Sequence, residues 1–283
     1  MKEDVTGQRE CPDGEKPVCV TGKPAASDVL IVYVLVLAYI AYAGYGFRAI
    51  GNKWLSLCFS AGFGILPLVY SLFRGFRVNS VFAVRKPSPR SLFGGIVLIV
   101  GVFSIVAGIL SVVGPYLPRN ANSDSALQIQ VMDESVLYSV LALAAFPAIF
   151  EEVLCRGFLL SGLRLAVSRR ASIALCAFLF ALLHMDPGRM PFTFIAGLAL
   201  SWAAVEAESL FVPITMHFAY NFLLFAAVRF GKALPISPGA VGAGDRYAVY
   251  RFAVIWVCVG ALLASIGASL VRRRDTAVSG DAA

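Results

Sequence analysis

Apolar residues occur in long blocks along this chain, and short polar segments separate the blocks. Eight of them have about the 20 residues that an α-helix needs to cross a bilayer. They span residues 29–47, 54–73, 92–114, 136–160, 171–189, 192–209, 211–230 and 247–271. The pattern predicts an all-α fold, a polytopic membrane bundle of about eight transmembrane helices. The sixth and seventh blocks are broken only around Glu206, Glu208 and Pro213, so a count of seven stays open.

Polar segments frame the apolar region. We expect a polar N-terminal tail at 1–27, one membrane domain at 28–272 and a polar C-terminal tail at 273–283. The N-terminal tail lacks the charged start and apolar core of a secretory signal. Cys11 and Cys19 lie in this tail and could form a disulfide or half of a metal site. We expect neither role, because a cytoplasmic tail keeps thiols reduced and two ligands make a poor zinc site.

Composition and charge agree with a membrane protein. Hydrophobic residues make up 59% of the chain and charged residues 14%, whereas soluble domains are about half apolar and a quarter charged. The net charge of +7 does not indicate nucleic-acid binding, because the basic residues lie between the apolar blocks. They gather at 74–90, 164–170 and 272–274, which eight spans place on the side of the N-terminus. We therefore expect cytoplasmic termini and a multi-pass protein of a prokaryotic cell (inner) membrane.

Ionisable residues inside the apolar blocks are the most informative feature of the sequence. The chain has two histidines, His184 and His217, and both lie in apolar blocks. A third block carries Glu151, Glu152 and Arg156 in the run FEEVLCRG. Each such group costs about 2.5–3.5 kcal/mol at a bilayer centre on insertion scales. We therefore expect these five residues to form a functional site.

The fourth block predicts one neutralised and one reactive carboxylate. Glu152 and Arg156 are separated by four residues, so on a helix they share a face and can pair. Glu151 points about 100° away, which allows it to face a cavity. Pro147 can kink the helix just before the pair. The alternative is a helix end at the interface, but the apolar FLLSGL run after Arg156 favours a continuing helix.

The two histidines have weaker local contexts. His184 follows Phe180 by four residues, and an Asp-Pro-Gly segment from Asp186 is expected to end the helix there. A lone histidine near a helix end is more often an interfacial residue than a catalyst. His217 and Asn221 are also separated by four residues and share a face. They could form an interhelical hydrogen-bond pair or two donors aimed at one oxygen.

Together these motifs resemble those of the CPBP intramembrane proteases, the family of the Rce1-type CAAX prenyl endopeptidases and their bacterial relatives. The family pattern is EExxxR, then FxxxH, then HxxxN or HxxxB, and all three motifs occur here in this order within 136–230. They read Glu151-Glu152-Val-Leu-Cys-Arg156, Phe180-Ala-Leu-Leu-His184 and His217-Phe-Ala-Tyr-Asn221. Cys155 stands where the family usually has an aromatic residue, which we expect to alter packing and not chemistry.

The resemblance implies a peptidase in which Glu151 is the general base and His184 helps to hold and polarise a water. It implies that His217 and Asn221 form an oxyanion hole for the tetrahedral intermediate. A carboxylate in a low-dielectric cavity suits a base that works near pH 7. Oxyanion donors contribute about 3–4 kcal/mol each in well-studied proteases.

The resemblance also implies that Glu152 and Arg156 support the base. A zinc ion with a bound water is an alternative, for which Glu151, His184 and His217 would be the ligands. HxxxN resembles a ligand pair less than HExxH does. We therefore favour a reaction without a metal or other cofactor.

The leading hypothesis from the sequence is an intramembrane glutamate-type endopeptidase that cleaves near the C-terminus of a membrane-attached protein or peptide. The substrate stays open between a CAAX-like tail, a sorting-signal helix and a bacteriocin-type peptide. One alternative is a proton-coupled transporter that uses the buried acids and histidines as a relay. No inverted repeat supports it. A second alternative is a non-catalytic membrane scaffold or immunity protein. The expected partners are the substrate and the lipid bilayer.

Overall fold

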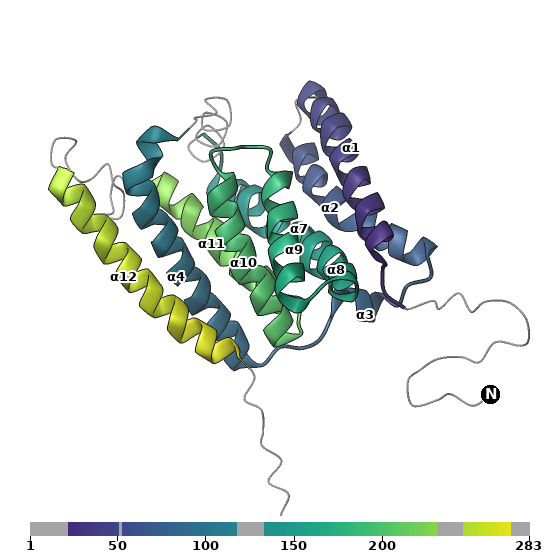
Figure 1. Cartoon of the computed structure of the whole chain (residues 1–283). Coiled ribbons are helices and arrows are strands. Elements are labelled where there is room, and N and C mark those ends of the chain that lie inside the picture. The colour runs from purple at the N-terminus through teal and green to yellow at the C-terminus, as the bar shows by residue number, and fades with distance from the viewer. Residues whose placement is uncertain (1–21, 51–52, 118–132, 231–245, 273–283) are drawn as a thin grey trace, which may run out of the picture.

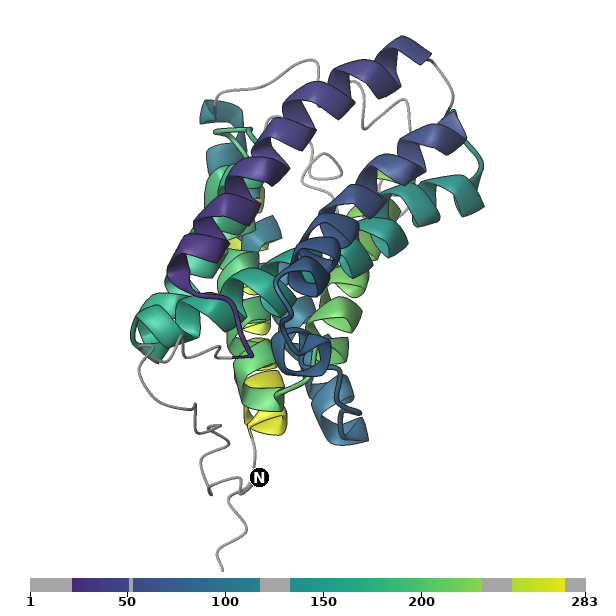
Figure 2. The same cartoon turned by 90° about the vertical axis from the view of Figure 1, so that its right-hand side faces the viewer.

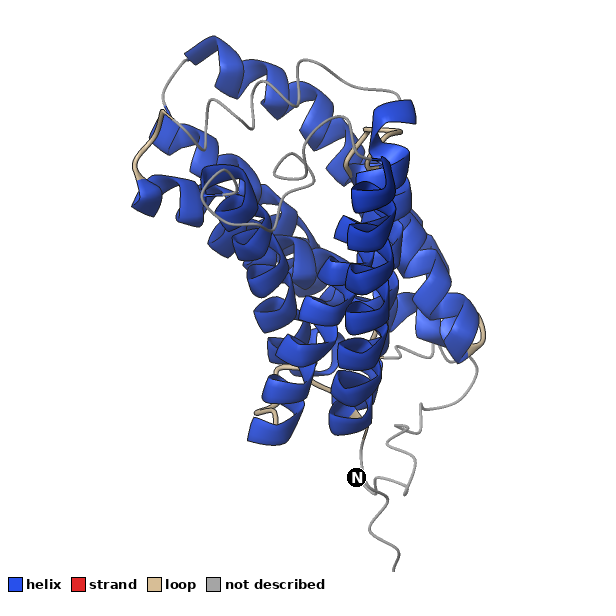
Figure 3. Ribbon diagram, turned by 90° about the vertical axis from the view of Figure 1, so that its left-hand side faces the viewer, coloured by secondary structure: helices blue, strands red, loops and turns tan. Residues whose placement is uncertain are grey.

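The computed structural model describes residues 22–50, 53–117, 133–230 and 246–272. In these ranges the chain folds into helices joined by short turns, with no strand (Figure 3). The all-helical class predicted from the sequence is thus confirmed. Cys11, Cys19, the C-terminal tail and most of the N-terminal tail lie outside the described residues.

Each of the eight apolar blocks lies on a helix, and the helices differ in length. The first half of the chain forms α1 (Ala26–Ile50), α2 (Lys53–Phe73), α3 (Val78–Phe82), α4 (Pro89–Val113) and a 3₁₀ turn, η1 (Gly114–Tyr116). The fourth block forms α6 (Val136–Val140), η2 (Leu141–Ala145), α7 (Phe146–Glu152), η3 (Val153–Leu159) and α8 (Leu160–Ala166). The last four helices are α9 (Arg169–Leu183), α10 (Met190–Ala207), α11 (Phe211–Phe230) and α12 (Arg246–Val271).

The structure does not confirm the predicted count of eight membrane-spanning helices in the ranges it describes. Among the described residues, six helices are long and apolar enough to cross a bilayer. The two exceptions are α9, which has 15 residues, and α2, whose apolar part Leu57–Phe73 is short. A multi-pass membrane protein is therefore established, but the count of eight spans is not confirmed. The sixth and seventh blocks are separate helices, because Glu208 takes a left-handed conformation with φ 48° between α10 and α11.

The helices pack into two adjoining groups (Figure 1). One buried cluster joins α1, α2, α3, η3, α8 and α9, and a second joins α4, α10, α11 and α12. Helices α1 and α2 pack together at one edge of the bundle, and α12 packs along α4 at the other (Figure 1). Figure 2 shows α1 and α2 side by side on the face toward the viewer. Helices α4 and α12 approach closely through glycines. A Cβ at Gly101 would clash with the backbone of Ala264, and one at Gly94 would lie 3.0 Å from Gly267 O.

The chain direction places several turns at the same end of the bundle. That end carries the start of α1, helix α3, the α8–α9 turn, the α10–α11 turn and the end of α12 (Figure 1). Ser168 caps α9 there by accepting a hydrogen bond from Ala171 N at 3.4 Å. Arg169 forms an ion pair with Glu206 of α10 beside this turn. We call it the basic end, after Lys23, Arg85, Arg164 and Arg169.

Candidate active site

The helix from Val136 to Ala166 contains two π-helical segments, one on each side of α7. The first, η2, ends just before Pro147, and Phe146 N donates to Leu141 O across five residues. Proline has no N–H and its ring crowds the preceding turn, so a widened turn accommodates it. The kink predicted at Pro147 is therefore a π-turn. Such turns are rare and are frequent at functional sites.

A buried ion pair lies where η3 begins. Arg156 Nη1 donates to Glu152 Oε1 at 2.7 Å, and both side chains are fully buried. The pairing predicted from the four-residue spacing is thus confirmed. His217 of α11 joins the same oxygen, with Nδ1 2.8 Å from Glu152 Oε1. A carboxylate can only accept a hydrogen bond, so Nδ1 of His217 is the donor in this pair.

Helix α10 completes the surroundings of Arg156. Its guanidinium also donates to Ser201 Oγ at 3.2 Å and to Gly197 O at 3.0 Å. On another side, its Cζ lies 4.6 Å from the centroid of the Phe180 ring. The charge of Arg156 is therefore met by a carboxylate, two further oxygens and an aromatic face. The sequence analysis missed Gly197 and Ser201, since a serine or glycine in an apolar helix has no distinctive pattern.

Glu152 is held between two donors, yet one of its oxygens has no partner. Its Oε2 is buried and accepts no hydrogen bond from any residue in the described ranges. An ionised carboxylate fully removed from water is stable only when it is paired and hydrogen-bonded. Arg156 and His217 supply this compensation entirely at Oε1. Glu152 is therefore a structural anchor, with no exposed surface for a substrate.

Phe180 brings the two histidine motifs together. Its ring contacts His184 edge-on, with centroids 5.0 Å apart, and His217 edge-on, with centroids 5.6 Å apart. Phe180 itself is buried. The two imidazoles and Arg156 thus surround one phenyl ring. The phenylalanine of the FxxxH motif is a packing centre that fixes three motif side chains, a role its sequence position alone did not reveal.

His184 lies at the end of α9, where its own backbone orients it. The side-chain Nδ1 is 3.0 Å from Phe180 O, and a carbonyl oxygen only accepts, so Nδ1 carries a proton. Met185 then takes a left-handed conformation with φ 46°, and Gly188 N donates to Asp186 Oδ1 at 3.0 Å. The predicted helix stop is confirmed. His184 is half-buried, and in a neutral ring with the proton on Nδ1 its Nε2 is an acceptor.

Glu151 and Asn221 differ from the residues above. Each is half-buried, and neither forms a hydrogen bond or ion pair with any residue that the structure describes. The structure therefore separates the two adjacent glutamates as expected: Glu152 is paired, and Glu151 is not. It does not join Glu151 to His184, or His217 to Asn221, by a direct hydrogen bond. His217 pairs with Glu152 instead.

This arrangement agrees with what comparison of the sequence with known families finds. Residues 133–223 match the family model described as type II CAAX prenyl endopeptidase Rce1-like. The resemblance drawn from the three motifs is thereby confirmed over this Rce1-like segment, which contains all seven motif residues of the candidate site, Phe180 included. No curated protein and no solved structure gives a significant match.

The described residues also bear on the zinc alternative. In the ranges given above, no three His, Cys, Asp or Glu side chains lie together in a group able to hold a metal ion. One nitrogen of His217 is already bonded to Glu152. As arranged here, Glu151, His184 and His217 do not form a three-ligand set. We therefore derive no catalytic step through a metal.

Proposed function

We propose that this protein is an intramembrane endopeptidase of the glutamate type, acting near the C-terminus of a membrane-attached protein or peptide. The observation that carries the proposal is that two adjacent carboxylates have different surroundings. Glu152 is paired with Arg156 and His217. Glu151, the preceding residue, has no such pair among the described residues, so both of its oxygens can accept a hydrogen bond from a water. The Rce1-like match of residues 133–223 supports a protease, since the family is one of intramembrane proteases.

Glu151 is the proposed general base. Its carboxylate is half-buried on α7. The neighbouring ionisable groups, Glu152 and Arg156, already form an ion pair with each other. A base must reach the proton that it removes from a water at about 2.6–3.2 Å. Since Glu151 makes no bond that would have to break, it can accept a proton from that water.

His184 is the proposed second holder of this water. Its Nδ1–H donates to Phe180 O, so the neutral ring presents Nε2 as an acceptor. An acceptor at Nε2 can orient a water by taking one of its hydrogens. Glu151 then removes the other proton as the water oxygen attacks the scissile carbonyl. The proton passes to the leaving amine as the C–N bond breaks.

His217 and Asn221 are the proposed oxyanion donors. Nδ1 of His217 already donates to Glu152, so a donor at Nε2 requires a second proton on the ring. The assignment thus implies that His217 acts as an imidazolium held against the Glu152 carboxylate. Asn221, one helical turn later on α11, supplies an amide N–H₂ with no competing partner in the described part of the chain.

The substrate class follows from where the site lies. The motif residues lie within helices long and apolar enough to cross a bilayer, or packed against them. A substrate must therefore reach the site through the membrane phase or along its surface. A CAAX-like tail, a sorting-signal helix and a bacteriocin-type peptide all meet this requirement. We place the termini in the cytoplasm on the positive-inside rule, with the basic end facing that compartment.

The test uses the full chain in proteoliposomes with a fluorogenic membrane-anchored peptide. Glu151→Gln should lower the cleavage rate by about 10²–10⁴-fold, the usual contribution of a general base. It should leave the unfolding midpoint unchanged, because Glu151 holds no partner. Glu206→Gln is the matched control, since it neutralises a carboxylate of α10 that pairs with Arg169 at the basic end. Full cleavage by Glu151→Gln, or by His184→Ala, would refute the mechanism.

A further inference from the structure

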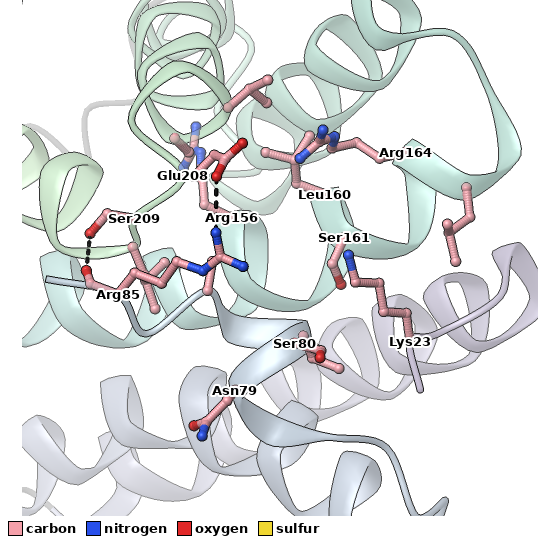
Figure 4. Close-up of a pocket in the computed structure, with 16 residues that line it drawn as sticks. Lys23, Asn79, Ser80, Arg85, Arg156, Leu160, Ser161, Arg164, Glu208 and Ser209 are labelled. Atoms are coloured by element: carbon pink, nitrogen blue, oxygen red, sulfur yellow. Dashed lines mark hydrogen bonds and ion pairs between the residues drawn. The ribbon is translucent and has the colours of Figure 1, made fainter. Parts of the chain in front are cut away.

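A cavity of about 410 Å³ opens at the basic end, away from the candidate catalytic residues. Its walls come from the segment before α1, from α3 and the linker that follows it, from α8, and from the α10–α11 turn (Figure 4). None of Glu151, His184, His217 or Asn221 lines it. Arg156 lies at its inner wall, with a side chain that is fully buried.

Positive charge dominates this cavity. Lys23, Arg85, Arg156 and Arg164 line it, against the single acid Glu208. Glu208 Oε2 accepts from Arg85 Nη1 at 3.0 Å, and Arg156 is neutralised by Glu152. Neither pairing involves Arg164. Figure 4 draws Lys23, Arg85 and Arg164 on different segments around one space.

The charge of Arg164 has no compensating partner among the residues that the structure describes. Its side chain is exposed in the last turn of α8 and forms no hydrogen bond or ion pair with any residue in the described ranges. The cavity therefore holds an excess of positive charge, and an anion is the complementary ligand.

Neutral donors and apolar atoms define the ligand further. Asn79 and Ser80 of α3 line the cavity, and their side chains make no hydrogen bond within the described residues, so both can donate to an anionic oxygen. Ser161 and Ser209 cannot donate, because their hydroxyls already donate to Phe158 O at 2.9 Å and to Arg85 O at 2.6 Å.

The apolar part of the lining includes Val81 of α3, Leu160 and Leu165 of α8, and Val205 and Leu210 near the α10–α11 turn. Leu165 is 54% exposed. A ligand that combines an anionic group with apolar atoms matches such a lining.

The place of the cavity near the helix ends favours a lipid over a soluble anion as its ligand. The lining residues other than those of the inner wall lie at or near helix ends, where headgroups meet a membrane protein. Basic pockets between transmembrane helices on the cytoplasmic side are known to bind anionic headgroups. We propose that this cavity binds the phosphate headgroup of an anionic phospholipid, with Arg164 as its principal charge and Asn79 and Ser80 as donors.

The test measures lipid binding and does not depend on peptidase activity. The full chain in detergent is titrated with phosphatidylglycerol or with phosphatidylcholine, and bound lipid is counted by native mass spectrometry. The wild type should prefer phosphatidylglycerol. Arg164→Gln should weaken that binding by about fivefold, the usual contribution of one basic residue. Arg164→Lys should retain it, since the charge remains. Arg170→Gln is the matched control, because Arg170 is exposed at the same end and does not line the cavity.

Four outcomes would overturn the proposal. Equal binding by the wild type and Arg164→Gln would remove the role of Arg164. An equal loss in Arg170→Gln would indicate diffuse surface charge. Inorganic phosphate that binds as tightly as the lipid, with the same dependence on Arg164, would indicate a soluble anion. Displacement of the lipid by a peptide with a free C-terminal carboxylate, but not by its amide, would assign the cavity to the peptide.

Discussion

The ion pair between Glu152 and Arg156 gives the sharpest prediction, made with Arg156→Met. The substitution preserves an unbranched side chain but removes the charge and the donors to Glu152, Ser201 and Gly197. Glu152 is fully buried and its Oε2 has no partner among the described residues, so its charge would be left with His217 alone. Breaking a buried pair by removing one partner costs about 3–5 kcal/mol. We expect Arg156→Met to lower the free energy of unfolding by about this amount.

A double-mutant cycle separates the pair from its surroundings. Glu152→Gln alone should also destabilise, because it leaves Arg156 buried and uncompensated. In Glu152→Gln/Arg156→Met neither member of the ion pair is charged, so the loss should be smaller than the sum of the single losses. The difference is expected to be on the order of 2 kcal/mol.

The assay is equilibrium unfolding in mixed micelles of increasing sodium dodecyl sulfate, followed by tryptophan fluorescence. Arg164→Met is the control, since Arg164 is an exposed arginine of α8 and surface substitutions change stability by about 0.5 kcal/mol or less. If Arg156→Met unfolds like the wild type, or if the double variant shows the full sum, the buried pair is not the anchor described here.

Three further predictions concern helix packing, a buried hydrogen bond and metal dependence. Gly101→Ala should destabilise the protein by about 1–3 kcal/mol, because its Cβ would overpack against Ala264. Gly114→Ala is the control, since nothing lies within 4 Å of its Cβ, and similar thermal midpoints for the two variants would contradict the α4–α12 contact. Asp28→Ala should cost about 1–3 kcal/mol in the same unfolding assay, because buried Asp28 accepts from Tyr70 Oη at 2.7 Å; unchanged stability would rule out this link. Prolonged chelation should leave peptide cleavage intact, and a loss restored by zinc would revive the metal alternative.

The motif helices show which contacts of the candidate site could be predicted from the sequence. The pairing of Glu152 with Arg156 follows from four-residue spacing on one helix, a local property that survives even in the π-helical segment η3. The stop after His184 is equally local, since it depends on the residues that follow. Contacts between helices are different. They depend on how each helix is rotated and how deeply it lies, which spacing within one helix does not encode.

His217 illustrates the limit. Spacing alone coupled it to Asn221 on its own helix, but the tertiary structure turns its Nδ1 toward Glu152 on another. The partners of Arg156 on α10 were equally hidden, since that helix is apolar on all sides and gives no facing signal. The count of eight spans is not confirmed for a related reason: α9 has 15 residues, fewer than a span needs, and part of its apolar surface is buried against neighbouring helices.

The sequence by itself determined that this chain is an all-α membrane protein, which helices carry the ionisable residues, and that three ordered motifs resemble an intramembrane protease. These conclusions depend on transfer free energy and helical periodicity, which act along one segment at a time. Only the tertiary structure decided that His217 binds the same Glu152 oxygen as Arg156, and that Phe180 joins both histidines. Burial and charge compensation are properties of several helices together, so they appear only once the helices are packed.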